Sequence, residues 1–380
     1  MNRSGKGFVK ICRFAVVLFV LAMAALRLHA QLPDTLHTGS VRLLFIGDMM
    51  GHDTQIAAAY DPKTGEYDYN EVFRYISPII SDADIAIANL EVTLAGAPYR
   101  GYPRFSSPAA FAAAASEAGI DIMVTANNHA IDRGLPGIDS TLFRLDSMGI
   151  ASTGTYRNAA ERKLRVPLMI ERNGIRLALL NYTYGTNGIQ LPQPAVVDLI
   201  DRNTISSDIQ AARVKQADGI IVFIHWGTEY DTLPGKEQKD IAGWLAEQGV
   251  DLIIGSHSHV IQPMLLEEDE TSGDRRLIVW SLGNFVSNQR NRRTDGGAMV
   301  AVTVSKKDGH LMIDEAGYIL TWVYTPVEEG LKRFYVLAAA RHENDNPVPG
   351  DIESKRAMSL FLNDSRRLLN CNNKGVKEIR

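Results

Sequence analysis

Short apolar runs alternate with longer amphipathic stretches along the first two thirds of the chain. The apolar runs predict strands at 41–46, 85–88, 120–124, 168–171, 175–181, 219–224 and 250–254. The amphipathic stretches predict helices at 69–80, 111–118, 136–148, 206–215 and 236–248. Near-continuous apolar strands separated by helices are typical of a largely parallel sheet that is covered on both faces.

The pattern changes after residue 255. Strands are predicted at 276–280, 298–304 and 318–324, with short connections that favour a second, more antiparallel sheet packed on the first. Residues 340–351 are polar and contain proline, which predicts a loop, and 352–369 form an amphipathic helix pattern. We therefore expect one continuous domain over 31–330, followed by a C-terminal appendage with a terminal helix over 331–380.

Polar residues follow the predicted strands at regular intervals. Five of the nine histidines lie in four short motifs, each at the end of an apolar run. In open α/β sheets, ligands bind outside the carboxyl ends of the strands. We expect the following side chains to meet at such an edge: Asp48, Asn89, Asn128, His225 and His257.

These residues are of types that bind metal. His257 and His259 lie on the same side of an extended segment, so both imidazoles can address one site or two adjacent ones. Glu91 can bridge two cations, although a solvated loop residue is the alternative, and Asp48 could instead cap a helix. Asn128 offers a neutral oxygen.

The donor mix limits the choice of metal. It is too rich in nitrogen for calcium and lacks the thiolates of structural zinc sites. It suits two divalent ions, manganese, iron or zinc, which together activate a shared water and clamp a phosphoryl or acyl oxygen. Neither a Gly-x-Ser-x-Gly elbow nor a Walker loop is present to support another chemistry.

The N-terminal region predicts export. Residues 1–30 contain five basic residues and no acidic one, so with a net charge of −4 for the 380-residue chain the remaining residues carry a charge of −9. An apolar run at 14–26 and a small residue, Ala30, follow the basic stretch, as in a signal peptide. The alternative is an uncleaved membrane anchor through 14–26. Either a signal peptide or an anchor places the rest of the chain outside the cytoplasm, where it would be periplasmic, secreted or membrane-anchored. The acidic net charge of residues 31–380 argues against nucleic acid as a partner.

Short polar motifs occur in a characteristic order along the chain. They are Gly47-Asp48-Met49-Met50, Asn89-Leu90-Glu91, Asn127-Asn128-His129-Ala130-x-Asp132-x-Gly134, Asn181-Tyr182-Thr183-Tyr184-Gly185-Thr186-Asn187-Gly188, His225-Trp226-Gly227-x-Glu229-Tyr230, Gly255-x-His257-x-His259-Val260-x-Gln262-Pro263 and Ser281-Leu282-Gly283-Asn284-Phe285. Together these motifs resemble the CapA family of poly-γ-glutamate capsule proteins, within the calcineurin-like metallophosphatase superfamily. The resemblance covers about residues 41 to 305 and implies a four-layer α/β/β/α sandwich.

The resemblance also implies roles for individual residues. Glu91 resembles the carboxylate that bridges the two ions, and His129 matches the superfamily's proton donor to the leaving group. The remaining ligands divide between a first ion, held by Asp48 and His259, and a second ion, held by Asn128, His225 and His257.

Two departures from the superfamily pattern affect these roles. The usual Asp-x-His pair is spread here to Asp48 and His52, which weakens the case for His52 as a ligand. The usual bridging Asp is replaced by Glu91, a change that alters the separation or occupancy of the ions.

The expected function is that of an exported metal-dependent hydrolase with phosphoesterase chemistry, acting in capsule, poly-γ-glutamate or other cell-envelope polymer synthesis. Arg100, Arg104 and Tyr184 are candidates for binding an anionic small-molecule or polymer substrate, with solvated loop positions as the alternative for the arginines. Membrane-bound capsule synthesis components are the expected partners. The alternative function is a non-catalytic, polymer-binding component of a synthesis or export complex with a vestigial metal site.

Overall fold

The computed structural model describes residues 39–268, 273–307, 309–343 and 352–380. The predicted signal peptide or anchor at 1–30 lies outside these ranges. None of the helices in the described ranges has both the length and the apolar composition that crossing a membrane requires.

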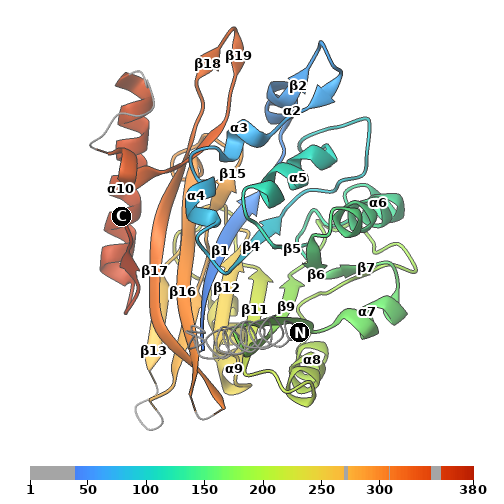
Figure 1. Ribbon diagram of the computed structural model, residues 1–380, viewed down its shortest axis with the longest axis vertical. Coiled ribbons are helices and arrows are strands. Elements are labelled where there is room, and N and C mark those ends of the chain that lie inside the picture. Colours follow the sequence, from blue (N-terminus) through green and yellow to red (C-terminus); the bar gives the residue numbers. More distant parts are fainter. Residues whose placement is uncertain (1–38, 269–272, 308, 344–351) are drawn as a thin grey trace, which may run out of the picture. The chain divides into compact units, whose positions relative to one another are not determined.

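The larger sheet has nine strands (Figure 1). Its path runs β20-β17-β16-β1-β4-β5-β6, with β15 beside β1 and β21 beside β17. Strands β1, β4, β5 and β6 are parallel, whereas β16, β17 and β20 extend the sheet in antiparallel order. The strands are β1 (Ser40–Met49), β4 (Ile85–Leu90), β5 (Ile122–Val124), β6 (Ala151–Thr153), β15 (Asn284–Val286), β16 (Gly296–Lys307), β17 (His310–Tyr324), β20 (Tyr335–Ala338) and β21 (Lys377–Glu378).

The second sheet has six strands in the order β13-β14-β12-β11-β9-β8. Its four central strands are parallel, and an antiparallel strand closes each edge. The strands are β8 (Leu168–Arg172), β9 (Ile175–Thr183), β11 (Gly219–His225), β12 (Leu252–Ser256), β13 (Met264–Glu268) and β14 (Arg275–Val279). Three two-stranded ribbons complete the β-structure: β2 (Tyr60–Asp61) with β3 (Glu66–Tyr67), β7 (Thr155–Tyr156) with β10 (Val196–Val197), and β18 (Val327–Glu328) with β19 (Leu331–Lys332).

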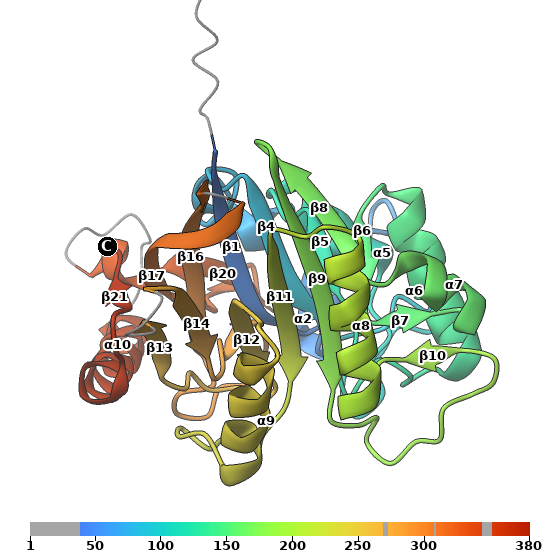
Figure 2. The ribbon, with the colours of Figure 1, turned by 90° about the horizontal axis from the view of Figure 1, so that it is seen from below.

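Helices cover the outer face of each sheet. On the larger sheet these are α3 (Asn70–Phe73), α4 (Ser77–Ile80) and α5 (Ala109–Glu117). On the second sheet they are α8 (Arg202–Val214), which Figure 2 shows next to β9, and α9 (Lys236–Glu247). The other helices are α2 (Asp53–Ala59), α6 (Gly134–Ser147), α7 (Ala159–Arg165), α10 (Ile352–Asn372) and the 3₁₀ turn η1 (Ala339–His342).

Successive side chains of each strand point to opposite faces of the sheet, and this alternation produces the layers. In β1, Leu43 and Phe45 belong to the core between the two sheets, while Leu44 and Ile46 pack toward the helices on the outer face. The core between the sheets takes side chains from both, including Phe223 of β11. The predicted α/β/β/α sandwich is therefore confirmed.

Three details of the prediction were wrong. The parallel strands do not form one sheet, because they divide between the two, and the antiparallel strands after residue 280 extend the larger sheet instead of forming their own. The predicted helix at 69–80 is two short helices. Pro78 lacks the N–H that would bond the Arg74 carbonyl in a continuous helix, so the helix is interrupted before it.

The segment that follows residue 330 packs within the same compact unit as the rest of the described chain. Strands β20 and β21 both pair with β17. Helix α10 contributes Met358, Phe361 and Leu362 to the core cluster that lies between the sheets.

Candidate metal centre

The carboxyl ends of strands from both sheets meet at one site. Asp48 near the end of β1 pairs in register with Asn89 of β4 and with Asn284 of β15. Opposite them, His225 ends β11 and pairs with Ser256 at the end of β12. The polar residues predicted for one sheet edge thus come from two sheets whose edges face each other.

Gly47 allows β1 to approach its neighbour closely here. A Cβ at this position would lie 2.1 Å from the carbonyl oxygen of Gly283, and the pairing with β4 shifts register between Ile46 and Asp48. A bulge of this kind redirects a side chain next to a functional site. The glycine before Asp48 is therefore required by the backbone packing that positions the carboxylate.

Two groups of donor atoms form at this edge. Asp48, Glu91 and His259 form one group, and Glu91, His225 and His257 form the other. Within each group the donor atoms lie within 4.8 Å of one another. All five side chains are at most 3% exposed, and Glu91 belongs to both groups.

The donor atoms of each group converge, as their individual distances show. His225 Nε2 lies 2.9 Å from Asn128 Oδ1, 3.1 Å from His257 Nδ1 and 3.7 Å from Glu91 Oε1. On the other side, His259 Nδ1 lies 3.2 Å from Asp48 Oδ2, and its Nε2 lies 3.9 Å from Glu91 Oε1.

Glu91 Oε1 is buried and has no hydrogen-bond partner among the described residues. An unpaired buried carboxylate oxygen is costly, so its position between two sets of imidazoles fits a shared cation ligand. The donor set of carboxylates, imidazoles and one amide oxygen suits a pair of divalent transition-metal ions. The residues therefore fit such ions.

The electrostatics of the centre agree with cation binding. Burial, followed by the charge of Asp48, raises the pKa of Glu91 well above its usual value. Burial, followed by neighbouring imidazoles, lowers the pKa of His225 well below its usual value and that of His257 to about 3. Both imidazoles are therefore neutral at pH 7 and can present lone pairs.

Asparagine side chains orient the carboxylates. Asn89 Nδ2 donates to Asp48 Oδ1 at 2.8 Å and to Glu91 Oε2 at 3.2 Å, while its Oδ1 accepts from Asn127 Nδ2 at 3.2 Å. Asn127 Oδ1 in turn accepts from the backbone N–H of His129 at 3.1 Å. Sequence reasoning assigned no orienting role to Asn89 or Asn127, although both stand directly in the motifs of the residues they hold.

Asn181 of β9 links the two sheets beneath the site. Its Oδ1 accepts from the backbone N–H groups of Thr125 and Ala126 at 3.1 and 2.6 Å, and its Nδ2 donates to the Phe223 carbonyl at 3.1 Å. The loop that carries Asn128 is therefore fixed by a strand of the opposite sheet. This contact joins residues more than fifty positions apart, and nothing in the sequence pattern indicates it.

His129 lies outside both donor groups and has a different partner. Its Nδ1 is 2.7 Å from Asp132 Oδ2, which also accepts from the backbone N–H of Phe105 at 2.7 Å. The carboxylate favours the tautomer with the proton on Nδ1. The three-residue spacing from His129 to Asp132 in the motif was the available signal for this pair.

His52 lies outside both donor groups as well. It precedes α2, and its Nδ1 accepts from the Asn288 backbone N–H at 3.2 Å. Its ring packs edge-on against Phe105 with centroids 5.4 Å apart.

The three candidate substrate-binding residues have different surroundings. Arg100 and Arg104 are exposed on the loop 100–106, and neither has a carboxylate partner in the described ranges. Phe105 anchors this loop, because its ring lies 4.7 Å from that of His129. Tyr184 is 47% exposed, and its ring centroid lies 4.5 Å from that of His257.

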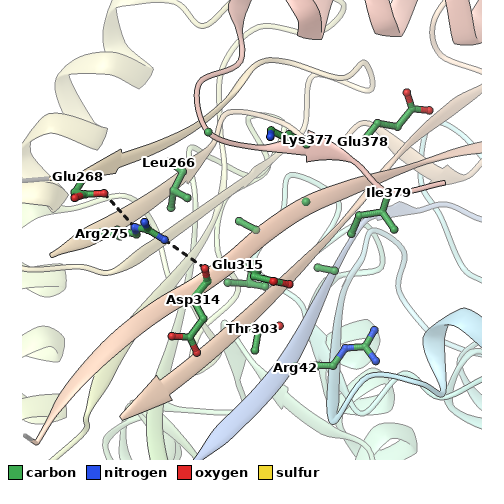
Figure 3. A pocket seen from close by; sticks show the side chains of 15 residues that line it. Arg42, Leu266, Glu268, Arg275, Thr303, Asp314, Glu315, Lys377, Glu378 and Ile379 are labelled. Carbon is green, nitrogen blue, oxygen red and sulfur yellow. Dashed lines mark hydrogen bonds and ion pairs between the residues drawn. The ribbon is translucent and has the colours of Figure 1, made fainter. Parts of the chain in front are cut away.

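A cavity of about 580 Å³ lies away from this centre, beside β16, β17 and β21 (Figure 3). Arg42 in its lining is six residues before Asp48 along β1, about 20 Å away at the usual rise of a strand. Its lining includes Glu268 and Arg275, which form an ion pair at 3.2 Å. The cavity is thus separate from the metal-binding residues.

Comparison with known proteins gives consistent matches. The model of the family described as bacterial capsule synthesis protein PGA_cap matches residues 42–289. The capsule biosynthesis protein CapA of Bacillus anthracis is 28% identical over 271 residues, covering 68% of this chain and 62% of that protein, so the match spans less than two thirds of that relative. The PGA biosynthesis protein CapA of Bacillus subtilis (strain 168) is 27% identical over 273 residues, 69% of this chain and 67% of that protein.

Among solved structures, the calcineurin-like phosphoesterase YfkN from Bacillus subtilis is similar at 13% identity and a TM-score of 0.43, covering 88% of this chain and 98% of that one.

Proposed function

From the premise that this chain belongs to the bacterial capsule synthesis protein family, as its motifs predicted, we propose that it is an exported, metal-dependent hydrolase with phosphoesterase chemistry. Its place of action is the synthesis of a capsule, poly-γ-glutamate or related envelope polymer. The observation that carries the chemical part of the proposal is the unpaired oxygen of Glu91, which is shared by two groups of buried donors.

The proposed ligands follow from the two groups. Asp48 and His259 would hold one ion, Asn128, His225 and His257 would hold the other, and Glu91 would bridge them. When bound, such a pair supplies Lewis-acid activation of water and of the phosphoryl oxygens.

His129 supplies a proton in this proposal. Asp132 holds the ring by its Nδ1, so Nε2 is the nitrogen that gives a proton to the departing oxygen. The burial of the pair and the packing of Phe105 against the ring limit water around it. In this proposal Arg100 and Arg104, on the loop that Phe105 anchors, bind the anionic part of a substrate, because guanidinium groups pair well with phosphate and carboxylate oxygens.

Export and membrane association form a separate part of the proposal. The basic and apolar pattern of residues 1–30 supports transfer out of the cytoplasm, and membrane-bound capsule synthesis components are the proposed partners. N-terminal sequencing of the protein from membrane and soluble fractions would distinguish a cleaved signal from an anchor through 14–26. Recovery of the protein in the cytoplasm alone would contradict export.

The chemical proposal is tested by metal analysis of the purified protein together with a panel of phosphomonoesters and phosphodiesters. We expect about two divalent ions per chain. The His129→Ala variant should keep the metal and lose turnover, whereas Asp48→Ala and His257→Ala should lose both. Bound metal without turnover of any ester, combined with retained binding of poly-γ-glutamate, would favour the non-catalytic alternative. A metal-free protein whose Asp48→Ala and His257→Ala variants remain functional would contradict both the metal-dependent hydrolase and the non-catalytic component with a vestigial metal site.

A further inference from the structure

Exposed tyrosines are concentrated around the candidate metal centre. Four tyrosines in the described ranges are largely exposed, namely Tyr60, Tyr102, Tyr184 and Tyr230, at 42%, 71%, 47% and 50%. Tyr60 lies on the ribbon β2–β3, and the other three lie on loops beside the centre. Aromatic side chains left in water beside a polar buried site are suited to ligand contact.

Two of the rings lie directly beside proposed ligands. The Tyr184 ring is 4.5 Å from that of His257 and nearly parallel to that of His225, at 6.3 Å and 10°. The Tyr230 ring is 6.2 Å from that of His259. Tyr230 has a φ of 69° and donates its N–H to the Ser258 carbonyl at 2.8 Å. A large residue in this conformation is strained, which is a feature of functional loops.

The third ring belongs to the loop that packs on His129. Tyr102 lies 6.4 Å from Phe105, whose ring contacts His129. Three loops from different parts of the chain therefore each present one tyrosine around the same centre.

Glu229 adds an acidic group to this edge. Its charge contributes, after burial, to raising the pKa of both Tyr184 and Tyr230. A carboxylate here disfavours a chain of carboxylates as the group bound beside the metals, and it accepts hydrogen bonds from hydroxyl groups. Phenol hydroxyls add further hydrogen-bonding groups beside apolar ring faces.

We propose that Tyr102, Tyr184 and Tyr230 form a tyrosine collar that binds the ring of a saccharide carrying the reacting phosphoryl group. The C–H faces of the sugar pack against the aromatic faces, and its hydroxyls bond the phenols and Glu229. The assignment of the phosphoryl group rests on the proposed function. The collar itself rests on the exposed rings and their distances to the centre.

Binding is tested by calorimetric titration of the full-length, Mn²⁺-loaded protein with glucose 1-phosphate, glycerol 3-phosphate and adenosine monophosphate. Glycerol 3-phosphate has the phosphate without a ring, so we expect glucose 1-phosphate to bind about tenfold more tightly. Tyr184→Ala and Tyr230→Ala should remove this preference without loss of metal, and Tyr184→Phe should retain most of it. Tyr60→Ala is the matched control on an exposed tyrosine outside the collar and should change nothing.

Equal affinities for the two phosphates would overturn the collar, and so would an unchanged preference in Tyr184→Ala and Tyr230→Ala. Tighter binding of adenosine monophosphate than of glucose 1-phosphate would overturn the saccharide assignment. Hydrolysis of bis(4-nitrophenyl) phosphate is measured in parallel. Ring preference without hydrolysis would defeat the proposed function and support the collar, while hydrolysis without ring preference would defeat the collar alone.

Discussion

Replacing Glu91 by glutamine should stabilise the metal-free protein and weaken its response to metal. Glu91 is 0% exposed, one of its oxygens has no partner in the described ranges, and burial followed by Asp48 raises its pKa. The group therefore opposes folding at neutral pH whenever no cation is bound. Glutamine has nearly the same shape, carries no charge, and can still accept a hydrogen bond from Asn89.

The expected change in the free energy of unfolding follows from the burial of Glu91. Replacing a buried ionic group by a neutral group of similar volume is often stabilising by about 1–4 kcal/mol, so we expect Glu91→Gln to add about 1–3 kcal/mol in the absence of metal. Because the folded-state pKa is raised, the favourable contribution of protonated Glu91 is present below about pH 4.5 and is lost as pH rises through the folded value. The gain from the substitution should therefore be largest at pH 7 and should fade toward pH 4.

With metal bound, the wild-type protein should become more stable than Glu91→Gln. At a free metal concentration of about 100 times Kd, the wild-type protein gains about 2.7 kcal/mol, and the variant gains less because it lacks the bridging carboxylate. Urea denaturation followed by intrinsic fluorescence, with EDTA or Mn²⁺ at pH 4 and pH 7, measures all four conditions. The exposed Glu117→Gln on α5 is the control. A metal-free variant less stable than wild type at pH 7, or a gain independent of pH, would refute the electrostatic argument.

Three further predictions concern neighbouring residues. Because the pKa of His257 is lowered to about 3, its contribution to metal-free stability is present above pH 6.5 and is lost as pH falls toward 3. His257→Asn should flatten this dependence by about 1.4 kcal/mol per pH unit in urea titrations, and an unchanged slope would contradict the assignment. Asp132→Asn should lower kcat about 100-fold at constant metal content, and a kcat equal to wild type would exclude Asp132 as the partner of His129. Asn181→Ala should lower the free energy of unfolding in urea by about 2–4 kcal/mol and raise the metal Kd, because two backbone N–H groups lose their acceptor. An unchanged Kd would show that Asn181 contributes to stability and not to metal binding.

Local patterns were sufficient to predict most strands and the polar residues that end them. Asp48, His225 and His257 could be placed at strand ends because each follows a run of apolar residues that is long enough for a buried strand. Which sheet each strand joins was not predictable from these runs. Parallel strands of both sheets have the same near-continuous apolar pattern, since both faces of each sheet are covered.

A contact between the two sheets explains why sequence reasoning missed Asn181. The hydrogen bond that Asn181 accepts from Ala126 depends on how β9 lies against the loop after β5, which is a property of the packed layers. By contrast, the pairing of His129 with Asp132 is local, and its three-residue spacing was visible in the motif.

The division of the ligands between two sheets has a consequence for folding. Each proposed ion would take at least one ligand from the larger sheet and one from the second, as Asp48 and His259 do for the first ion. Metal bound at this edge would therefore cross-link the two sheets and offset the cost of the buried carboxylates near Glu91. Binding free energy at such a site adds to folding free energy, because the unfolded chain has no preformed site. The protein without metal should consequently open first along the edge between β1 and β12, where hydrogen exchange of the backbone N–H of His257, which lies 3.4 Å from Asp48 Oδ2, would report it.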